Sequence, residues 1–132
     1  MSTHPTLDGL TILVVDDNAA VRDAVAEMLA QAGATVLAEE SADGALATLI
    51  RERPDVLLSD IAMPGHDGLW LISQVRALPA DRGGETPAIA VTGHMLGENP
   101  AAILSAGFQC CLLKPVGVQD LAMNVSRLAR GR

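Results

Sequence analysis

The chain has 132 residues, of which 49% are hydrophobic, and it carries a formal net charge of −7 at pH 7. This length leaves room for one domain with one sizeable core. The acidic balance, the single lysine and the 2% aromatic content argue against nucleic-acid binding, which needs clustered cations or stacking platforms. No apolar run is long enough to cross a bilayer, and the N-terminus lacks the apolar core of a signal peptide. We therefore expect a cytoplasmic domain without membrane contact.

Five apolar runs of strand length alternate with five segments of helical periodicity. We expect residues 1–9 to be an N-terminal tail or the end of a linker, and residues 10–130 to form the domain. The expected buried strands lie at residues 11–15, 35–38, 56–59, 88–91 and 110–113. The expected helices begin near residues 18, 41, 67, 99 and 118.

Capping and stop residues mark the helix boundaries. Ser41 is the expected N-cap of the second helix, and Asn99, followed by proline, that of the short fourth helix. The apolar spacing places Ala24 on the buried face of the first helix and Ile50 on the buried face of the second.

The alternation of strands and helices predicts an α/β fold with a parallel sheet, helices on both faces and right-handed crossovers. Ligands of such sheets bind outside the carboxyl ends of the strands, where the strand order reverses. Reactive side chains follow or end four of the expected strands: Asp16 and Asp17, Asp60, Thr92, and Lys114. We therefore expect these five side chains to converge in one crevice.

These residue types suit a divalent cation and a phosphoryl group. Carboxylates about 4 Å apart repel one another by roughly 4 kcal/mol per pair at an effective dielectric constant near 20, and a hard cation such as Mg²⁺ removes that penalty. Lys114 supplies a point charge and Thr92 a hydroxyl donor, both of which suit phosphate oxygens. One carboxylate could then act as a nucleophile and form an aspartyl phosphate.

The chain resembles the receiver domains of two-component response regulators and hybrid histidine kinases over residues 10–128. The resemblance rests on Val-Val-Asp-Asp-Asn ending at Asn18, Asp-Ile-Ala-Met-Pro-Gly-His-Asp-Gly beginning at Asp60, Val-Thr-Gly around Thr92, and Lys-Pro at Lys114. It implies the flavodoxin-like doubly wound fold, with a five-stranded parallel sheet of order 2-1-3-4-5 and five helices.

The resemblance also implies roles for the acidic residues. Asp60 matches the phosphoacceptor, which also contacts the metal. Asp17 matches a direct Mg²⁺ ligand, and Asp16 a ligand that acts mainly through water. The backbone carbonyl of Ala62 matches the remaining protein ligand.

Two more positions match the family, and one departs from it. Thr92 matches the switch hydroxyl and Lys114 its charge partner, with a cis bond between Lys114 and Pro115. The family usually carries Tyr or Phe three residues before the lysine, where this chain has Cys111. A thiol is too small for the same movement, so the usual readout through the fourth helix, fifth strand and fifth helix is expected to change.

The resemblance implies a signalling phosphoacceptor that catalyses only its own phosphorylation and dephosphorylation. The expected partner is a histidine kinase or a histidine phosphotransfer domain. An output partner could bind the face formed by the fourth helix, the fifth strand and the fifth helix. Two alternatives stay open at this point. A Mg²⁺-dependent phosphohydrolase of the haloacid dehalogenase type would need a second acid where Ala62 lies, and a non-phosphorylated pseudo-receiver would not need the complete acidic set. Both a free-standing regulator and a segment of a hybrid kinase fit the sequence.

Four other side chains and one loop have expected placements. Cys110 and Cys111 should point to opposite faces of their strand and stay unpaired. His66 is expected to be a solvated loop residue, and Trp70 to pack at the periphery of its helix. Residues 93–98 are expected to change most on phosphorylation.

Overall fold

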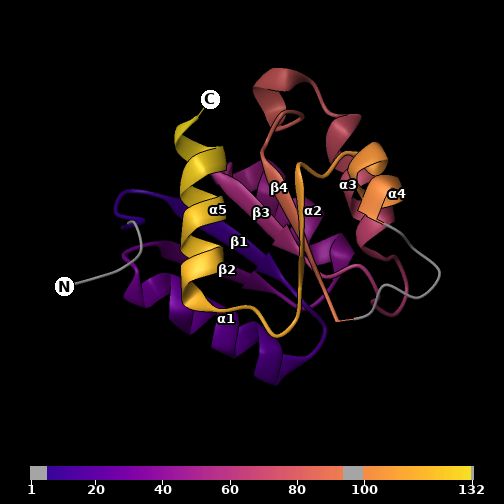
Figure 1. Ribbon diagram of the computed structural model, residues 1–132. Coiled ribbons are helices and arrows are strands. Elements are labelled where there is room, and N and C mark those ends of the chain that lie inside the picture. Colours follow the sequence, from indigo (N-terminus) through magenta and orange to yellow (C-terminus); the bar gives the residue numbers. More distant parts are fainter. Residues whose placement is uncertain (1–5, 94–99, 132) are drawn as a thin grey trace.

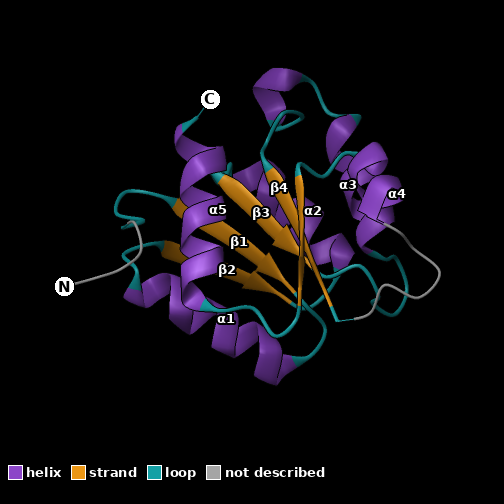
Figure 2. Ribbon diagram, in the orientation of Figure 1, coloured by secondary structure: helices purple, strands orange, loops and turns teal. Residues whose placement is uncertain are grey.

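The structure is a computed structural model that describes residues 6–93 and 100–131. The described residues form a five-stranded parallel sheet with five α-helices and one short 3-10 helix (Figure 1; Figure 2). The strands are β1 (Thr11–Val15), β2 (Thr35–Glu39), β3 (Val56–Ser59), β4 (Ala88–Thr92) and β5 (Cys110–Leu113). The helices are α1 (Ala19–Gln31), α2 (Ala42–Glu52), α3 (Gly68–Arg76), η1 (Ala80–Arg82), α4 (Pro100–Ala106) and α5 (Val118–Arg130). The sheet order β2-β1-β3-β4-β5 confirms the predicted doubly wound topology.

Helices cover both faces of the sheet (Figure 1). α1 and α5 pack on one face through residues such as Leu29 and Leu121, and α2, α3 and α4 pack on the other through residues such as Leu49 and Ile72. Successive residues of β1, β3 and β4 alternate between the two clusters, as the pleat requires. None of the helices in the described part of the chain combines the length and apolar character needed to cross a membrane.

Three side-chain caps set the beginnings of the helices that follow β1, β2 and β3. Asn18 accepts the amide of Val21 at 3.1 Å, and Ser41 accepts that of Gly44 at 3.1 Å. Asp67 accepts the amide of Trp70 at 2.8 Å. Such caps stabilise a helix by about 1 kcal/mol each, and the Ser41 cap was predicted from the sequence. The predicted cap Asn99 lies outside the described residues, as do residues 94–98 of the loop expected to respond to phosphorylation.

Two residues that were predicted to lie on the buried faces of their helices do not, so these predictions are wrong. Ala24 is exposed on α1, and Ile50 on α2 is 40% exposed. On α2 the buried face is rotated toward Thr48, which is 4% exposed and donates its hydroxyl to Glu39 at 2.7 Å. Apolar spacing does not reveal a buried hydroxyl that has a partner on a neighbouring strand, so the periodicity alone misplaced the face.

The segment expected to be a tail or linker end is in part packed onto the domain. Leu7 is fully buried in the cluster of α1 and α5, and its amide donates to the carbonyl of Ala32 at 2.7 Å. Arg130, near the end of α5, donates to the carbonyls of Thr6 and Asp8 at 3.3 and 3.1 Å. The folded unit therefore includes residues before Leu10.

Cys110 and Cys111 are free thiols, as predicted. Cys110 packs against the cluster beneath α1 and α5, whereas Cys111 packs against the cluster beneath α2, α3 and α4. The two side chains thus lie on opposite faces of β5, which confirms the alternation expected for a strand.

Arg76, at the C-terminal end of α3, joins three segments that are distant in the sequence. Its guanidinium donates to the backbone carbonyls of Gly84, Thr86 and Gly107 over 2.8–3.0 Å, and to the side chain of Gln109 at 3.1 Å. These bonds attach the end of α4 and the start of β4 to α3. The apolar pattern of the sequence contained no signal for this contact.

Replacing Arg76 with alanine should lower the free energy of unfolding by about 2–3 kcal/mol, because several carbonyls lose a charged donor and water restores only part of the loss. Urea denaturation followed by circular dichroism would measure the change. Arg82 is exposed on η1 and offers a matched control, and Arg82→Ala should change stability by no more than about 0.5 kcal/mol. Equal losses in the two variants would contradict the structural role of Arg76.

Candidate functional site

The carboxyl ends of four neighbouring strands deliver the predicted site residues. Asp16 follows β1, Asp60 follows β3, Thr92 ends β4 and Lys114 follows β5. Strand pairing sets their relative heights, since the amide of Asp60 donates to the carbonyl of Val15 and the amide of Lys114 to that of Thr92, both at 2.9 Å. The predicted convergence at one edge of the sheet is confirmed for these residues.

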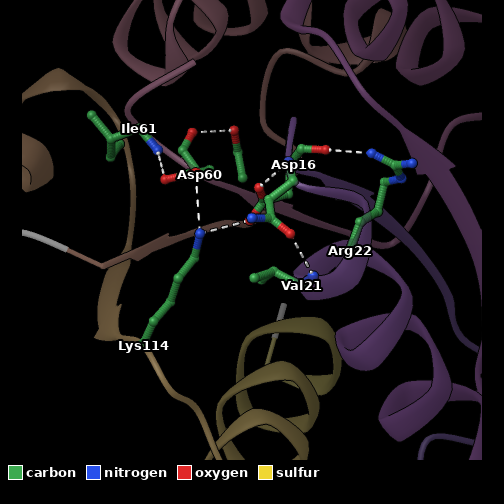
Figure 3. A network of polar contacts seen from close by, with 8 residues as sticks. Asp16, Val21, Arg22, Asp60, Ile61 and Lys114 are labelled. Carbon is green, nitrogen blue, oxygen red and sulfur yellow. Dashed lines mark hydrogen bonds and ion pairs between the residues drawn. The ribbon is translucent and has the colours of Figure 1, made fainter.

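Lys114 bridges two of the carboxylates (Figure 3). Its ammonium lies 2.7 Å from Oδ2 of Asp16 and 3.1 Å from Oδ2 of Asp60. Asp16 and Asp60 are 4% and 8% exposed. Desolvation of such buried charges is costly, and the shared ammonium offsets part of that cost. The peptide bond between Lys114 and Pro115 is cis, as the resemblance implied.

A third carboxylate completes an acidic cluster. Asp17 is exposed beside Asp16, and one oxygen of each of Asp16, Asp17 and Asp60 lies within 4.8 Å of the others. The cluster holds three carboxylates and one ammonium, which contacts two of them, so it carries an excess of negative charge. Oxygen ligands in this number and of this charge suit a hard divalent cation, so the residues fit the metal that the sequence predicted.

The phosphoacceptor candidate Asp60 is held in one orientation by its neighbours. Its Oδ1 accepts the amide of Ile61 at 2.7 Å, and its backbone carbonyl accepts the hydroxyl of Ser59 at 2.8 Å. Gly68, at the start of α3, packs so closely that a β-carbon there would lie 2.2 Å from that carbonyl. Glycine is therefore required at position 68 if the helix is to begin against Asp60.

Burial and charge shift two pKa values in the site. Burial raises the pKa of Asp60 above its ordinary value of 3.8, and nearby Asp16 adds to the rise, although Lys114 opposes it. Burial alone would lower the pKa of Lys114, but the hydrogen bonds to Asp16 and Asp60 outweigh burial and raise it. The ammonium therefore stays charged, while the ionised form of Asp60 is disfavoured in the absence of further positive charge.

The remaining predicted residues lie around this centre. Thr92 is 3% exposed at the end of β4, next to the backbone of Lys114. Ala62 is exposed in the loop between β3 and α3, two residues beyond Asp60. Cys111 is half-buried on β5, and burial raises the pKa of its thiol.

Two contributors to the site were not predicted. Arg22 on α1 donates to the backbone carbonyl of Asp16 at 2.8 Å (Figure 3), and Ser59 is fully buried beneath Asp60. A serine at the last position of an otherwise apolar buried strand is a usable sequence signal for such a contact. Arg22 gives no comparable signal, because its partner is a backbone atom.

His66 is an exposed loop residue, as expected, but its side chain also has two partners that were not predicted. Its Nδ1 lies 2.6 Å from Oδ1 of Asp43 on α2, and its ring stacks on that of Trp70 with centroids 3.7 Å apart. Trp70 is half-buried at the edge of the core, in line with the predicted peripheral packing. Trp70 is only four residues away, but Asp43 lies 23 residues away on α2, and a local sequence pattern cannot reveal that contact.

Asp60→Asn should stabilise the metal-free protein at neutral pH. Because the pKa of Asp60 is raised on folding, its stabilising contribution is present below the ordinary value of 3.8 and is lost as the pH rises through the higher folded value. Above that window the neutral amide avoids the cost of a buried charge, a gain on the order of 1 kcal/mol. Urea titrations in chelating buffer would measure this gain, which should shrink as the pH falls toward 3.8.

Asp23→Asn is the control, because Asp23 is exposed on α1 and folding does not withdraw its carboxylate from water. It should leave stability nearly unchanged across the same pH range. A loss of stability in Asp60→Asn at neutral pH would mean that the attraction of Lys114 outweighs burial, contrary to the direction argued here.

The response regulator receiver domain family model matches residues 12–126. An uncharacterised 14.6 kDa protein of Leptolyngbya boryana is 45% identical over 122 residues, covering 92% of each protein. The sensor protein GacS of Pseudomonas syringae pv. syringae is 34% identical over 86% of this chain, although this chain spans just 13% of that protein. Among solved structures, the receiver domain of sensor histidine kinase PA1611 from Pseudomonas aeruginosa has a magnesium ion coordinated in its active site cleft. The match covers 92% of this chain and 98% of the PA1611 receiver domain, with a TM-score of 0.84 and 29% sequence identity. With the family model matching most of its length and the sheet order as expected, the chain belongs to the response regulator receiver domain family.

Proposed function

We propose that this chain is the phosphoacceptor of a two-component phosphorelay and that Asp60 receives the phosphoryl group. The observation that carries the proposal is the contact of the Lys114 ammonium with both Asp16 and Asp60 inside a cluster of three carboxylates. A structural ion pair would need one carboxylate for one ammonium. The surplus negative charge supports a site that binds an additional cation.

Mg²⁺ is the proposed cofactor. Asp16, Asp17, Asp60 and the backbone carbonyl of Ala62 would hold it, and the oxygen-only ligand set suits a hard ion that keeps several waters. When bound, Mg²⁺ supplies the charge that neutralises phosphoryl oxygens during transfer. The magnesium ion in the cleft of the PA1611 receiver supports this assignment.

The proposed transfer moves one phosphoryl group between two side chains. An oxygen of Asp60 attacks the phosphorus of a phosphohistidine on the partner, the P–N bond breaks, and the departing imidazole takes a proton from solvent. Lys114, already 3.1 Å from Asp60, would neutralise charge on the phosphoryl oxygens, and the hydroxyl of Thr92 would donate to one of them. The donor is thus a histidine kinase or a histidine phosphotransfer domain.

The proposed output surface is the face formed by α4, β5 and α5. Leu104, Leu113 and Met123 on these elements are 45%, 58% and 50% exposed, and exposed apolar side chains often mark docking sites. Cys111 lies on β5, as Leu113 does, and has a small side chain. The readout that we propose therefore uses movement of the elements themselves and not the swing of an aromatic ring.

A phosphohydrolase that turns over separate substrates is the weaker candidate. Ala62 offers no acid two residues beyond the nucleophile, so no side chain there could protonate a leaving group. We accordingly propose that the domain is not an enzyme in that sense and acts only on its own aspartyl phosphate. A cytoplasmic location is proposed as well, and it is supported by two free thiols of the kind that reducing compartments preserve.

Incubation of the wild-type protein with acetyl phosphate and Mg²⁺ should add one phosphoryl group, seen as a single mass increase by intact mass spectrometry. Asp60→Asn should add none, and a chelator should abolish the addition to the wild type, because the acceptor oxygen or the neutralising charge is missing. Asp23→Asn should react like the wild type. Phosphorylation of Asp60→Asn at the wild-type level would contradict the assignment of the acceptor.

A further inference from the structure

The loop between β3 and α3 has two fixed ends and an exposed tip. Asp60 and Ile61 are buried at its start, and at its end the amide of Gly68 donates to the carbonyl of Ile61 at 2.8 Å. Residues 64–66 form the tip and are exposed. Met63, which is 8% exposed and packs in the core, lies between this tip and Ala62, whose backbone carbonyl is the proposed metal ligand. The position of that carbonyl therefore depends on what holds the loop.

His66 supplies the polar anchors of the tip. Its Nδ1 lies 2.6 Å from Oδ1 of Asp43 in the first turn of α2, and because a carboxylate only accepts, Nδ1 carries the proton. Its ring lies on that of Trp70 in α3, with an angle of 6° between the planes. Within the described part of the chain, no other hydrogen bond, ion pair or ring contact involves residues 62–66.

The contact with Asp43 bridges a surface groove. The groove separates the beginning of α2 from the tip of the loop, and it is lined by Ser41, Ala42, Asp43, Pro64, Gly65 and His66. The backbone at Gly65 has a φ of 75°, and a β-carbon there would meet nothing within 4 Å. The loop thus passes through a residue type with ample conformational freedom, directly before the anchored side chain of His66.

We propose that His66 is a positioning residue for the metal site, which holds the loop between β3 and α3 so that the Ala62 carbonyl is placed before the cation arrives. This inference rests on the proposed function, because it concerns the same Mg²⁺ site. Mg²⁺ demands near-ideal octahedral geometry, so a displaced carbonyl weakens binding. A loop that is already ordered also avoids the entropic cost of being ordered by the ligand.

The two anchors can be removed separately. His66→Ala loses both, His66→Phe keeps an aromatic face for Trp70, and Asp43→Ala keeps the stacking. Isothermal titration calorimetry with MgCl₂ at one fixed pH should show binding about five-fold weaker in His66→Ala and about two-fold weaker in each of the other two, the range expected for residues that act through others. Asp43→Asn, which keeps an oxygen acceptor, should bind close to the wild-type level.

The double variant His66→Phe/Asp43→Ala distinguishes positioning from general destabilisation. It should bind Mg²⁺ no more weakly than His66→Phe alone, because both changes break one and the same contact, whereas unrelated destabilisations would add. Gln31→Ala removes a similar exposed bond, 3.2 Å long, to Glu27 on α1, and should leave the affinity unchanged. Urea denaturation of all variants would record any change in global stability separately.

A readout in the metal-free protein tests the loop itself. Backbone ¹⁵N order parameters of Ala62 and Gly65 should lie near the rigid value of about 0.85 in the wild type and fall below about 0.6 in His66→Ala. Unchanged order parameters, or an unchanged magnesium affinity in His66→Ala, would overturn the role of His66 and leave the proposed function intact. A wild-type protein that binds no Mg²⁺ would instead overturn the proposed function.

Discussion

The ammonium of Lys114 is the interaction on which the rest of the site depends. It contacts Asp16 and Asp60 at the ends of adjacent strands, where the carboxylate side chains are 6% and 9% exposed. Without it the two carboxylates would face one another largely withdrawn from water, with a repulsion of several kcal/mol. The pKa of Lys114 stays high in spite of burial because both carboxylates are bonded to it. One charge, placed 98 positions along the chain from Asp16, thus holds the carboxyl edge of the sheet together.

The strand order explains how that charge reaches its partners. β1 pairs with β3, and β4 separates β3 from β5, so the lysine that follows β5 must extend past the end of β4. The carbonyl of Thr92 holds the amide of Lys114 at 2.9 Å, which sets where the side chain begins. A β-carbon at Gly93, the residue after β4, would lie 3.6 Å from Cδ of Lys114, which is an ordinary van der Waals contact. The side chain of Lys114 therefore passes directly beside the end of β4.

The parts of this arrangement that could be predicted from sequence are those that follow from the order of elements along the chain. Parallel strands bring their carboxyl ends to one edge, so Asp16 and Asp60 could be paired without coordinates. The orientation of α2 could not, because Thr48 is buried with a hydrogen bond to Glu39 of β2 while Ile50 is exposed. The contact of His66 with Asp43 likewise joins segments 23 residues apart, and both side chains are polar and exposed. Periodicity describes which face is apolar, and it carries no information about a polar side chain whose partner lies on another element.

The loop beside Asp60 belongs to the core cluster beneath α2, α3 and α4, and not to the cluster beneath α1 and α5. Met63, in the loop beside Asp60, packs in the same cluster as Leu71 of α3 and Ile103 of α4, and Cys111 of β5 packs against that cluster. Among the described residues, the cluster beneath α1 and α5 contains no member of this loop. Close-packed interiors transmit a change of shape to the groups that they touch, so if the proposed phosphorylation shifted this loop, the shift would reach α3, α4 and β5 through this cluster. A thiol at position 111 remains part of that packing although it is small. This cluster therefore joins the site to α4 through many contacts, and the readout that we propose would not require one large side chain on β5.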